Sequence, residues 1–213
     1  MSYFPMFIDL TNCDCLIVGG GMVAYRKAMT LLDFDAKVFV VAPDICDSLM
    51  ELSKSSNRLF VWERDFLDED LSGKTLVVVA TNNATFNREI SKKCKALSIP
   101  VNVVDVKDEC GFIFPSYVKE QNLIAAFSSS GNSPVLTQYL KKKEKDVLTP
   151  FLGDLNECLG KWRKNVLEIF PTEKERKEVF LRIVEEGLSG NIVPSDEKIR
   201  EIISDIQRKD EAR

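Results

Sequence analysis

The chain has 213 residues and a formal net charge of -4, a size that accommodates one medium domain and a smaller appendage. Hydrophobic residues make up 45% and charged residues 29% of the sequence, which is an ordinary globular composition. The sequence contains no histidine, and this excludes Ser-His-Asp and Cys-His hydrolysis as well as imidazole acid–base chemistry. The acidic balance argues against nucleic-acid binding.

Targeting signals and cysteines add little to this picture. No apolar run approaches the ~18 residues that cross a bilayer, and the first ten residues show neither a basic region nor a cleavage motif. We therefore expect no membrane contact and a cytoplasmic location. The cysteines form no C-x-x-C pair, so we expect reduced, mostly buried thiols and no protein-bound metal.

Five short apolar runs alternate with amphipathic stretches in the first half of the chain. Runs rich in β-branched residues are typical of strands that are covered on both faces of a parallel sheet. We predict an α/β fold with a doubly wound parallel sheet of the Rossmann type over residues 1–111. The expected strands are 15–18, 38–41, 59–62, 76–80 and 101–104, and the expected helices are 22–33, 44–55 and 83–97.

A glycine-rich turn directly follows the first run. Gly19-x-Gly21-x-x-Ala24 has the form G-x-G-x-x-A, in which the first glycine permits a tight turn and the second lets the backbone approach a pyrophosphate. The helix that begins here presents free N–H groups to the phosphates. The turn predicts dinucleotide binding, and a βα turn without a ligand is the alternative.

Polar residues follow the other strands at the edge that faces the cofactor in such folds. Asp44 ends the second strand, where a carboxylate binds the ribose 2′-hydroxyl and repels the extra phosphate of NADP. We therefore expect NAD, although Pro43 can turn this side chain away. Thr81 and Asn82 end the fourth strand, and they either bond the ribose or amide or cap the next helix.

The fifth strand brings Asp105 to the same edge. Because the chain lacks histidine, Asp105 is the best-placed candidate for a general base, with a turn or capping role as the alternative. The loop 128–133 precedes a helix and either presents hydroxyl and N–H groups to an anion or forms a capped turn.

The second half of the chain predicts a hairpin and helices. Runs at 112–114 and 123–127, separated by a turn at 119–122, predict two antiparallel strands. Helix starts are expected at Ser133-Pro134, at the capping box that begins with Thr172 and after Pro194-Ser195. We divide this half into a hairpin and helix, 112–145, and a C-terminal helical domain, 146–213.

Three blocks of this sequence resemble the siroheme synthase family in their order and spacing. They are Asp14–Ala28, then Asn102–Asp105 with Phe112–Ser116, and then Ser128–Leu136. The last block departs from the family pattern, because Ser130 and Asn132 stand where a glycine and a threonine are common.

The resemblance implies NAD-dependent oxidation of precorrin-2 to sirohydrochlorin, to which some members add insertion of ferrous iron. It also implies a homodimer in which the hairpin and helical parts exchange contacts, so that 112–145 is a dimerisation region. A non-catalytic NAD-sensing module, or a chelatase or carrier that uses no cofactor, are the alternatives.

The resemblance also assigns residues by position. Met22, Val23, Pro43 and Asp44 would touch NAD, and Asp105 would be the family's essential aspartate. Ser129 matches a serine that is phosphorylated in some members. The basic residues Arg26-Lys27 and Lys141–Lys143 are candidates for binding the carboxylates of the tetrapyrrole.

Overall fold

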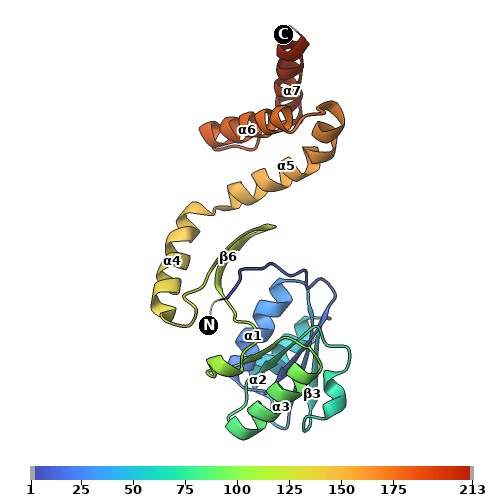
Figure 1. Ribbon diagram of the computed structural model, residues 1–213, viewed down its shortest axis with the longest axis vertical. Helices are drawn as coiled ribbons and strands as arrows, with labels where there is room; N and C mark the ends of the chain where they lie inside the picture. The colour runs from blue at the N-terminus through green and yellow to red at the C-terminus, as the bar shows by residue number, and fades with distance from the viewer. Residues whose placement is uncertain (1–2, 212–213) are drawn as a thin grey trace. The chain divides into compact units, whose positions relative to one another are not determined.

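The computed structural model describes residues 3–211, with side chains as far as Lys209. The predicted start without a leader thus lies partly outside the described residues. The chain forms two compact units, Met1–Phe114 and Pro115–Arg213; in Figure 1 the first runs from blue to green and the second from green to red.

Unit 1 is built on a parallel sheet of five strands in the order β3-β2-β1-β4-β5. The chain adds β2 and β3 on one side of β1 and then β4 and β5 on the other side. This change of side is characteristic of a doubly wound sheet, so the predicted fold class is confirmed. The strands are β1 (Asp14–Val18), β2 (Lys37–Ala42), β3 (Leu59–Glu63), β4 (Leu76–Val79) and β5 (Val101–Val103).

Helices cover both faces of this sheet (Figure 1). Residues of α1 (Met22–Asp33) and α2 (Asp47–Ser55) share one buried cluster with β1, β2 and β4. Residues of α3 (Ala84–Ala96) and the 3-10 helix η1 (Asp68–Leu71) share the other. A second 3-10 helix, η2 (Lys107–Glu109), follows β5.

The junction between the units differs from the sequence prediction. Phe112 and Phe114 pack against the cluster under α1, so unit 1 extends to residue 114 rather than 111. The expected strand 112–114 is wrong, because Pro115 offers no N–H for pairing and these aromatic side chains belong to the first core.

The hairpin itself begins later than predicted. Strand β6 (Ser116–Glu120) pairs antiparallel with β7 (Leu123–Phe127), with Glu120 opposite Leu123. The turn is therefore Gln121-Asn122 alone. Its side chains bind α5, because Gln121 donates to Asp154 and Asn122 donates to Glu157 at 2.7 Å.

Four helices complete unit 2; the starts of α4, α6 and α7 were predicted, and the start of α5 at Pro150 was not. Ser133 caps α4 by accepting from the N–H of Leu136 at 3.2 Å, and Thr172 and Glu175 form the predicted capping box. The predicted boundary at 145/146 falls inside α4. The helices are α4 (Pro134–Val147), α5 (Pro150–Ile169), α6 (Glu173–Gly190) and α7 (Asp196–Glu211).

The core of unit 2 is separate from the hairpin. Side chains of α5, α6 and α7 form one buried cluster, in which Val166, Ile183 and Ile199 are fully enclosed. Within residues 3–211, no helix combines the length and the apolar character that a membrane span requires. All six cysteines are free thiols.

Candidate dinucleotide site

The predicted site residues of unit 1 follow the carboxyl ends of neighbouring strands. Asp44 follows β2, Gly19 follows β1, Thr81 follows β4 and Asp105 follows β5. Because all these strands are parallel, the four positions lie along one edge of the sheet. Strands are spaced by ~4.8 Å, so Asp105 is about 10 Å from the strand that leads into the glycine turn.

The glycine turn is closely packed between the two neighbouring strand ends. Gly19 has φ +127, and a Cβ there would overlap the carbonyl oxygen of Ala80 at the end of β4. A Cβ on Gly20 would overlap the carbonyl oxygen of Asp44. Gly20, which the sequence pattern leaves undefined, is thus as constrained as the fingerprint position Gly19.

Gly21 differs, because a Cβ there would have no neighbour within 4 Å. Gly21 is the N-cap of α1 and provides no side-chain cap, so the first N–H groups of the helix have no partner within the helix. Such a terminus binds anions. Met22 and Val23 in the first turn are 48% and 40% exposed, and Ala24 is fully buried against the sheet. The turn therefore fits a pyrophosphate.

The end of β2 is bound directly to the glycine turn. The N–H of Cys46 donates to the carbonyl oxygen of Gly20 at 2.8 Å, and this bond delays the start of α2 to Asp47 instead of the predicted residue 44. Pro43 and Asp44 are both exposed. Asp44 is thus exposed beside the glycine turn, where its carboxylate could accept a hydrogen bond from a ribose hydroxyl.

At the end of β4, the Thr81 side chain bonds to Asn83 and Asn87 instead of pointing freely into solvent. The Thr81 hydroxyl donates to Asn87 and accepts from the N–H of Asn83 at 3.2 Å, and Asn87 donates back to the Thr81 carbonyl at 2.9 Å. Asn83, rather than its predecessors, caps α3 by accepting from Phe86. Asn82 is exposed at the sheet edge.

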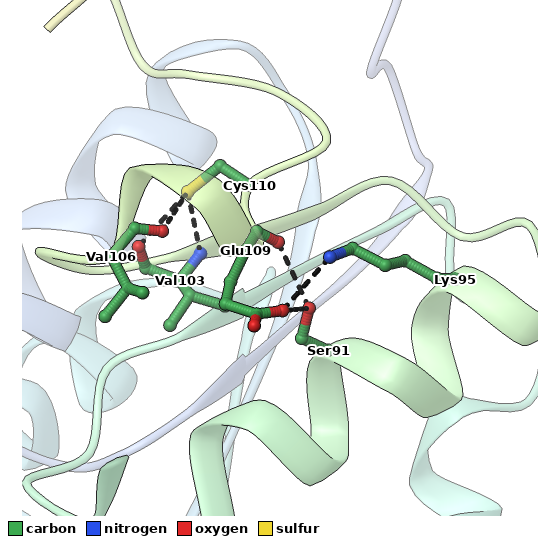
Figure 2. A network of polar contacts seen from close by, with 6 residues as sticks. All are labelled: Ser91, Lys95, Val103, Val106, Glu109 and Cys110. Carbon is green, nitrogen blue, oxygen red and sulfur yellow. Dashed lines mark hydrogen bonds and ion pairs between the residues drawn. The ribbon is translucent and has the colours of Figure 1, made fainter. Parts of the chain in front are cut away.

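Asp105 lies in a tight turn that a cysteine holds at both ends. Asp105 is exposed and has φ +62, inside a turn closed by a 3.3 Å bond from the N–H of Val106 to the carbonyl of Val103. The Cys110 thiol accepts from the N–H of Val103 at 3.3 Å and contacts the carbonyl oxygens of Val103 and Val106 at 3.2 and 3.3 Å (Figure 2). Burial raises the pKa of this thiol, which keeps it protonated as a donor.

The same loop is fastened to α3 by a second set of contacts (Figure 2). The Glu109 carboxylate accepts from Ser91 at 2.9 Å and from Lys95 at 3.0 Å. The hydrogen bonds from Lys95 and Ser91 lower the pKa of Glu109. The turn that carries Asp105 is thus fixed from both sides, and neither Cys110 nor Glu109 was identified from the sequence.

Comparison with known proteins agrees with this geometry. Residues 6–116, more than half of the chain, match the family model described as "Putative NAD(P)-binding". The chain belongs to this NAD(P)-binding family. The dinucleotide-binding character predicted from the glycine turn is therefore confirmed at the level of the family.

Curated relatives extend the similarity beyond this unit. A siroheme synthase of Vesicomyosocius okutanii is 37% identical over 207 residues, which cover 97% of this chain and 44% of that protein. A siroheme synthase of Neisseria meningitidis is 38% identical over 84% of this chain and 37% of its own length. The chain thus spans less than half the length of these relatives, and its predicted resemblance to siroheme synthases is confirmed.

A solved structure shares the fold of the whole chain. The protein described as "SirC, precorrin-2 dehydrogenase" superimposes with a TM-score of 0.79 over 97% of this chain and all of that chain, at 24% identity. This likeness confirms the succession of parallel sheet, hairpin and C-terminal helices.

Ser129 lies in unit 2, in the loop between β7 and α4. Its hydroxyl accepts from the N–H of Ser133 at 3.0 Å, and its carbonyl accepts from Asn132 at 3.0 Å. Ser130 and Gly131 have φ of +53 and +81. The loop is a turn held by its own residues, and a substrate contact or modification at Ser129 stays a prediction.

Lys27, a predicted candidate for substrate binding, lies over an aromatic ring of unit 1. Its ammonium lies 3.7 Å from the centroid of the Phe114 ring, and Phe114 packs against Phe112 with 5.3 Å between centroids. Burial lowers the pKa of Lys27, and the negative charge of Asp105 opposes this shift. The Lys27 side chain thus packs on Phe114, in the segment that follows the Asp105 turn along the chain.

Proposed function

We propose that this protein oxidises precorrin-2 to sirohydrochlorin with NAD as the electron acceptor. The observation that carries the proposal is the arrangement along one sheet edge. There a glycine turn that fits a pyrophosphate lies two strands from an exposed carboxylate, in a chain without histidine. The similarity to siroheme synthases over nearly the whole chain points to a tetrapyrrole as the substrate.

The residues divide the work between binding and proton transfer. A bound NAD supplies the acceptor for the hydride that leaves a C–H bond of the substrate. The proton that must leave with it goes to the Asp105 carboxylate, which acts as general base. The N-terminus of α1 would hold the pyrophosphate of bound NAD, and Met22 and Val23 in its first turn would contact the neighbouring groups of the cofactor.

We propose NAD rather than NADP because of Asp44. Its exposed carboxylate follows β2, where it would accept a hydrogen bond from the adenosine 2′-hydroxyl and repel a 2′-phosphate. Parallel titrations of the protein with NAD and NADP test this choice, and tighter binding of NADP would contradict it.

The proposed reaction is tested by an anaerobic assay. Purified protein with precorrin-2 and NAD should form NADH and sirohydrochlorin in equal amounts. Asp105→Asn should lower kcat about 100- to 10,000-fold, the usual contribution of a general base, with NAD affinity unchanged. Normal turnover in this variant would remove Asp105 from the reaction. NAD binding by the wild-type protein without any change in the tetrapyrrole would instead support a sensing module.

Two further predictions belong to the same assay. Adding ferrous iron tests whether sirohydrochlorin becomes siroheme; here iron is a substrate, and residues 3–209 contain no cluster of His, Cys, Asp and Glu that could hold a metal ion. Measuring the same activity in the soluble and membrane fractions of a cell lysate tests the cytoplasmic location expected from the sequence.

We also propose that the protein is a homodimer. The two-stranded hairpin of unit 2 is an element that is marginally stable alone, and the helix that follows it exposes apolar side chains. Within α4, Val135 is 80%, Leu136 52% and Tyr139 56% exposed. An exposed apolar patch of this kind is typical of a protein–protein interface, and we propose that a second copy of the chain covers it.

A further inference from the structure

We infer that the Lys27 ammonium binds a carboxylate of the tetrapyrrole and so fixes the substrate beside Asp105. The inference rests on the proposed function for the identity of the substrate. Its basis in the structure is a half-buried lysine whose ammonium lies over the ring of Phe114, in the segment that follows the turn of the candidate base along the chain.

The position of Lys27 on α1 directs it toward the site. Long side chains in a helix point back toward its N-terminus, and α1 begins at Met22, directly after the glycine turn. Lys27 lies just over one helical turn beyond Met22. We therefore infer that its side chain extends toward the ligand edge of the sheet.

Phe114 holds the ammonium without neutralising it. The distance of 3.7 Å from the nitrogen to the ring centroid is that of a cation–π contact. This contact occupies one side of the ammonium and leaves N–H donors unused. Among residues 3–209, no carboxylate or carbonyl oxygen accepts a hydrogen bond from Lys27 or forms an ion pair with it.

A half-buried cation without an anionic partner is a costly arrangement. Removal from water disfavours the charged form, and burial accordingly lowers the pKa of Lys27. The negative charge of Asp105 acts on this ammonium in the opposite direction. An incoming carboxylate would supply the missing partner, and a charge-assisted hydrogen bond in such surroundings is stronger than one at an exposed lysine.

The carboxylates of the substrate could supply the anionic partner that Lys27 lacks. Precorrin-2 is a polycarboxylate, whereas the protein carries a net charge of -4, so binding depends on individual cations placed at the site. Lys27 and Asp105 together would define one end of the substrate. Lys27 would hold a carboxylate, and Asp105 would face the C–H or N–H group that loses its proton.

The test compares Lys27→Met with Lys27→Arg. Methionine keeps the unbranched side chain and its packing on Phe114 but removes the charge, while arginine restores a cation over the ring. Lys92→Met is the matched control, because Lys92 is an exposed lysine on α3 of the same unit. Thermal melting of each variant establishes that it is folded.

Binding is measured first, without cofactor. Sirohydrochlorin is titrated onto each protein and followed by its absorbance and fluorescence. Lys27→Met should raise Kd about tenfold, the factor that corresponds to one charge-assisted hydrogen bond. Lys27→Arg should recover most of the affinity, and Lys92→Met should match the wild type.

Turnover and NAD titration then separate the alternatives. Lys27→Met should raise the KM for precorrin-2 about tenfold with little change in kcat. An unchanged Kd for sirohydrochlorin would overturn the inference, and so would a wild type that does not bind it. Weaker binding of NAD alone would assign the ammonium to the cofactor phosphates instead. A wild type that binds sirohydrochlorin but does not oxidise precorrin-2 would overturn the proposed function, while the Kd values still decide the role of Lys27.

Discussion

The backbone of Asp105 shapes how the proposed base can be studied. Its φ of +62 is in the left-handed region, which asparagine and aspartate enter more readily than other side chains apart from glycine. Asp105→Asn therefore removes the carboxylate and keeps the turn, whereas Asp105→Ala would also strain the backbone. A loss of activity in the asparagine variant is thus chemical in origin.

The two adjacent glycines of the turn give a prediction at the same scale. In Gly20→Ala the new methyl group overlaps the carbonyl of Asp44, and the free energy of unfolding should fall by at least the ~1–3 kcal/mol of an overpacked core. In Gly21→Ala the methyl group enters open space, so stability should change by less than ~1 kcal/mol. The affinity for NAD should nevertheless fall about tenfold or more, because this methyl group occupies the approach of the pyrophosphate.

Denaturant unfolding and NAD titration of both variants measure the two effects. Each glycine serves as the control for the other, because both changes add one methyl group within the same turn. Undiminished NAD affinity in a folded Gly21→Ala protein would show that the dinucleotide does not approach the turn as proposed.

At the scale of elements, the sequence pattern predicted the strands of the sheet because burial on both faces leaves a visible run of apolar residues. The run 112–114 looked the same and yet is not a strand. Its phenylalanines pack against a helix that is distant in sequence, a fact that no local pattern contains. The start of α2 was missed for a similar reason, since Cys46 bonds to Gly20 across the turn.

The short helix η1 gives a prediction about pH. Arg64 donates two hydrogen bonds to Asp70, at 2.6 and 2.9 Å, and Asp70 also accepts from the N–H of Leu67 at 2.8 Å. The Asp70 side chain is 6% exposed. The bonds from Arg64, followed by the bond from Leu67, lower the pKa of this carboxyl group, against the opposing effect of burial.

A lowered pKa in the folded state means that ionised Asp70 stabilises the fold above its unfolded pKa of about 3.9. This stabilisation is lost as the pH falls through the folded pKa. Asp70→Asn should lower the free energy of unfolding at pH 7 by about 1–3 kcal/mol. The difference from the wild type should shrink below pH 4, as measured by denaturant unfolding at several pH values. A difference that does not depend on pH would contradict this role.

At the scale of the whole molecule, the exposed face of α4 predicts the oligomeric state. Val135→Glu combined with Leu136→Glu should convert the proposed dimer into a monomer of 24.1 kDa, as measured by light scattering after gel filtration. Acidic side chains in the first turn of a helix interact favourably with the helix dipole, so the two substitutions should leave α4 folded. Leu181→Glu, at a 53% exposed leucine of α6, is the control and should leave the mass unchanged. A dimer in the double variant would exclude this face as the interface.

The parallel sheet that the sequence predicted explains which candidate site residues share one edge of the sheet, while their roles stay predictions. The positions of Gly19, Asp44 and Asp105 follow from parallel strands whose ends share an edge. The supporting contacts could not be predicted, because Lys27 meets Phe114, and Cys110 meets Val103, only after the chain has folded. Packing between distant segments leaves no periodic signal in the sequence.

The short strand β5 lies at the edge of its sheet, and within residues 3–211 no further strand pairs with its outer side. The segment that follows Asp105 takes that place: Gly111 donates to the carbonyl of Val101 at 2.7 Å, Asn102 donates to the carbonyl of Phe112 at 3.0 Å, and the Cys110 thiol occupies both polar groups of Val103. An exposed edge strand can pair with the edge strand of another molecule and so cause aggregation. The loop that presents the proposed base therefore also protects β5 from edge-to-edge pairing with other molecules, and alkylation or oxidation of Cys110 should lower solubility as well as activity.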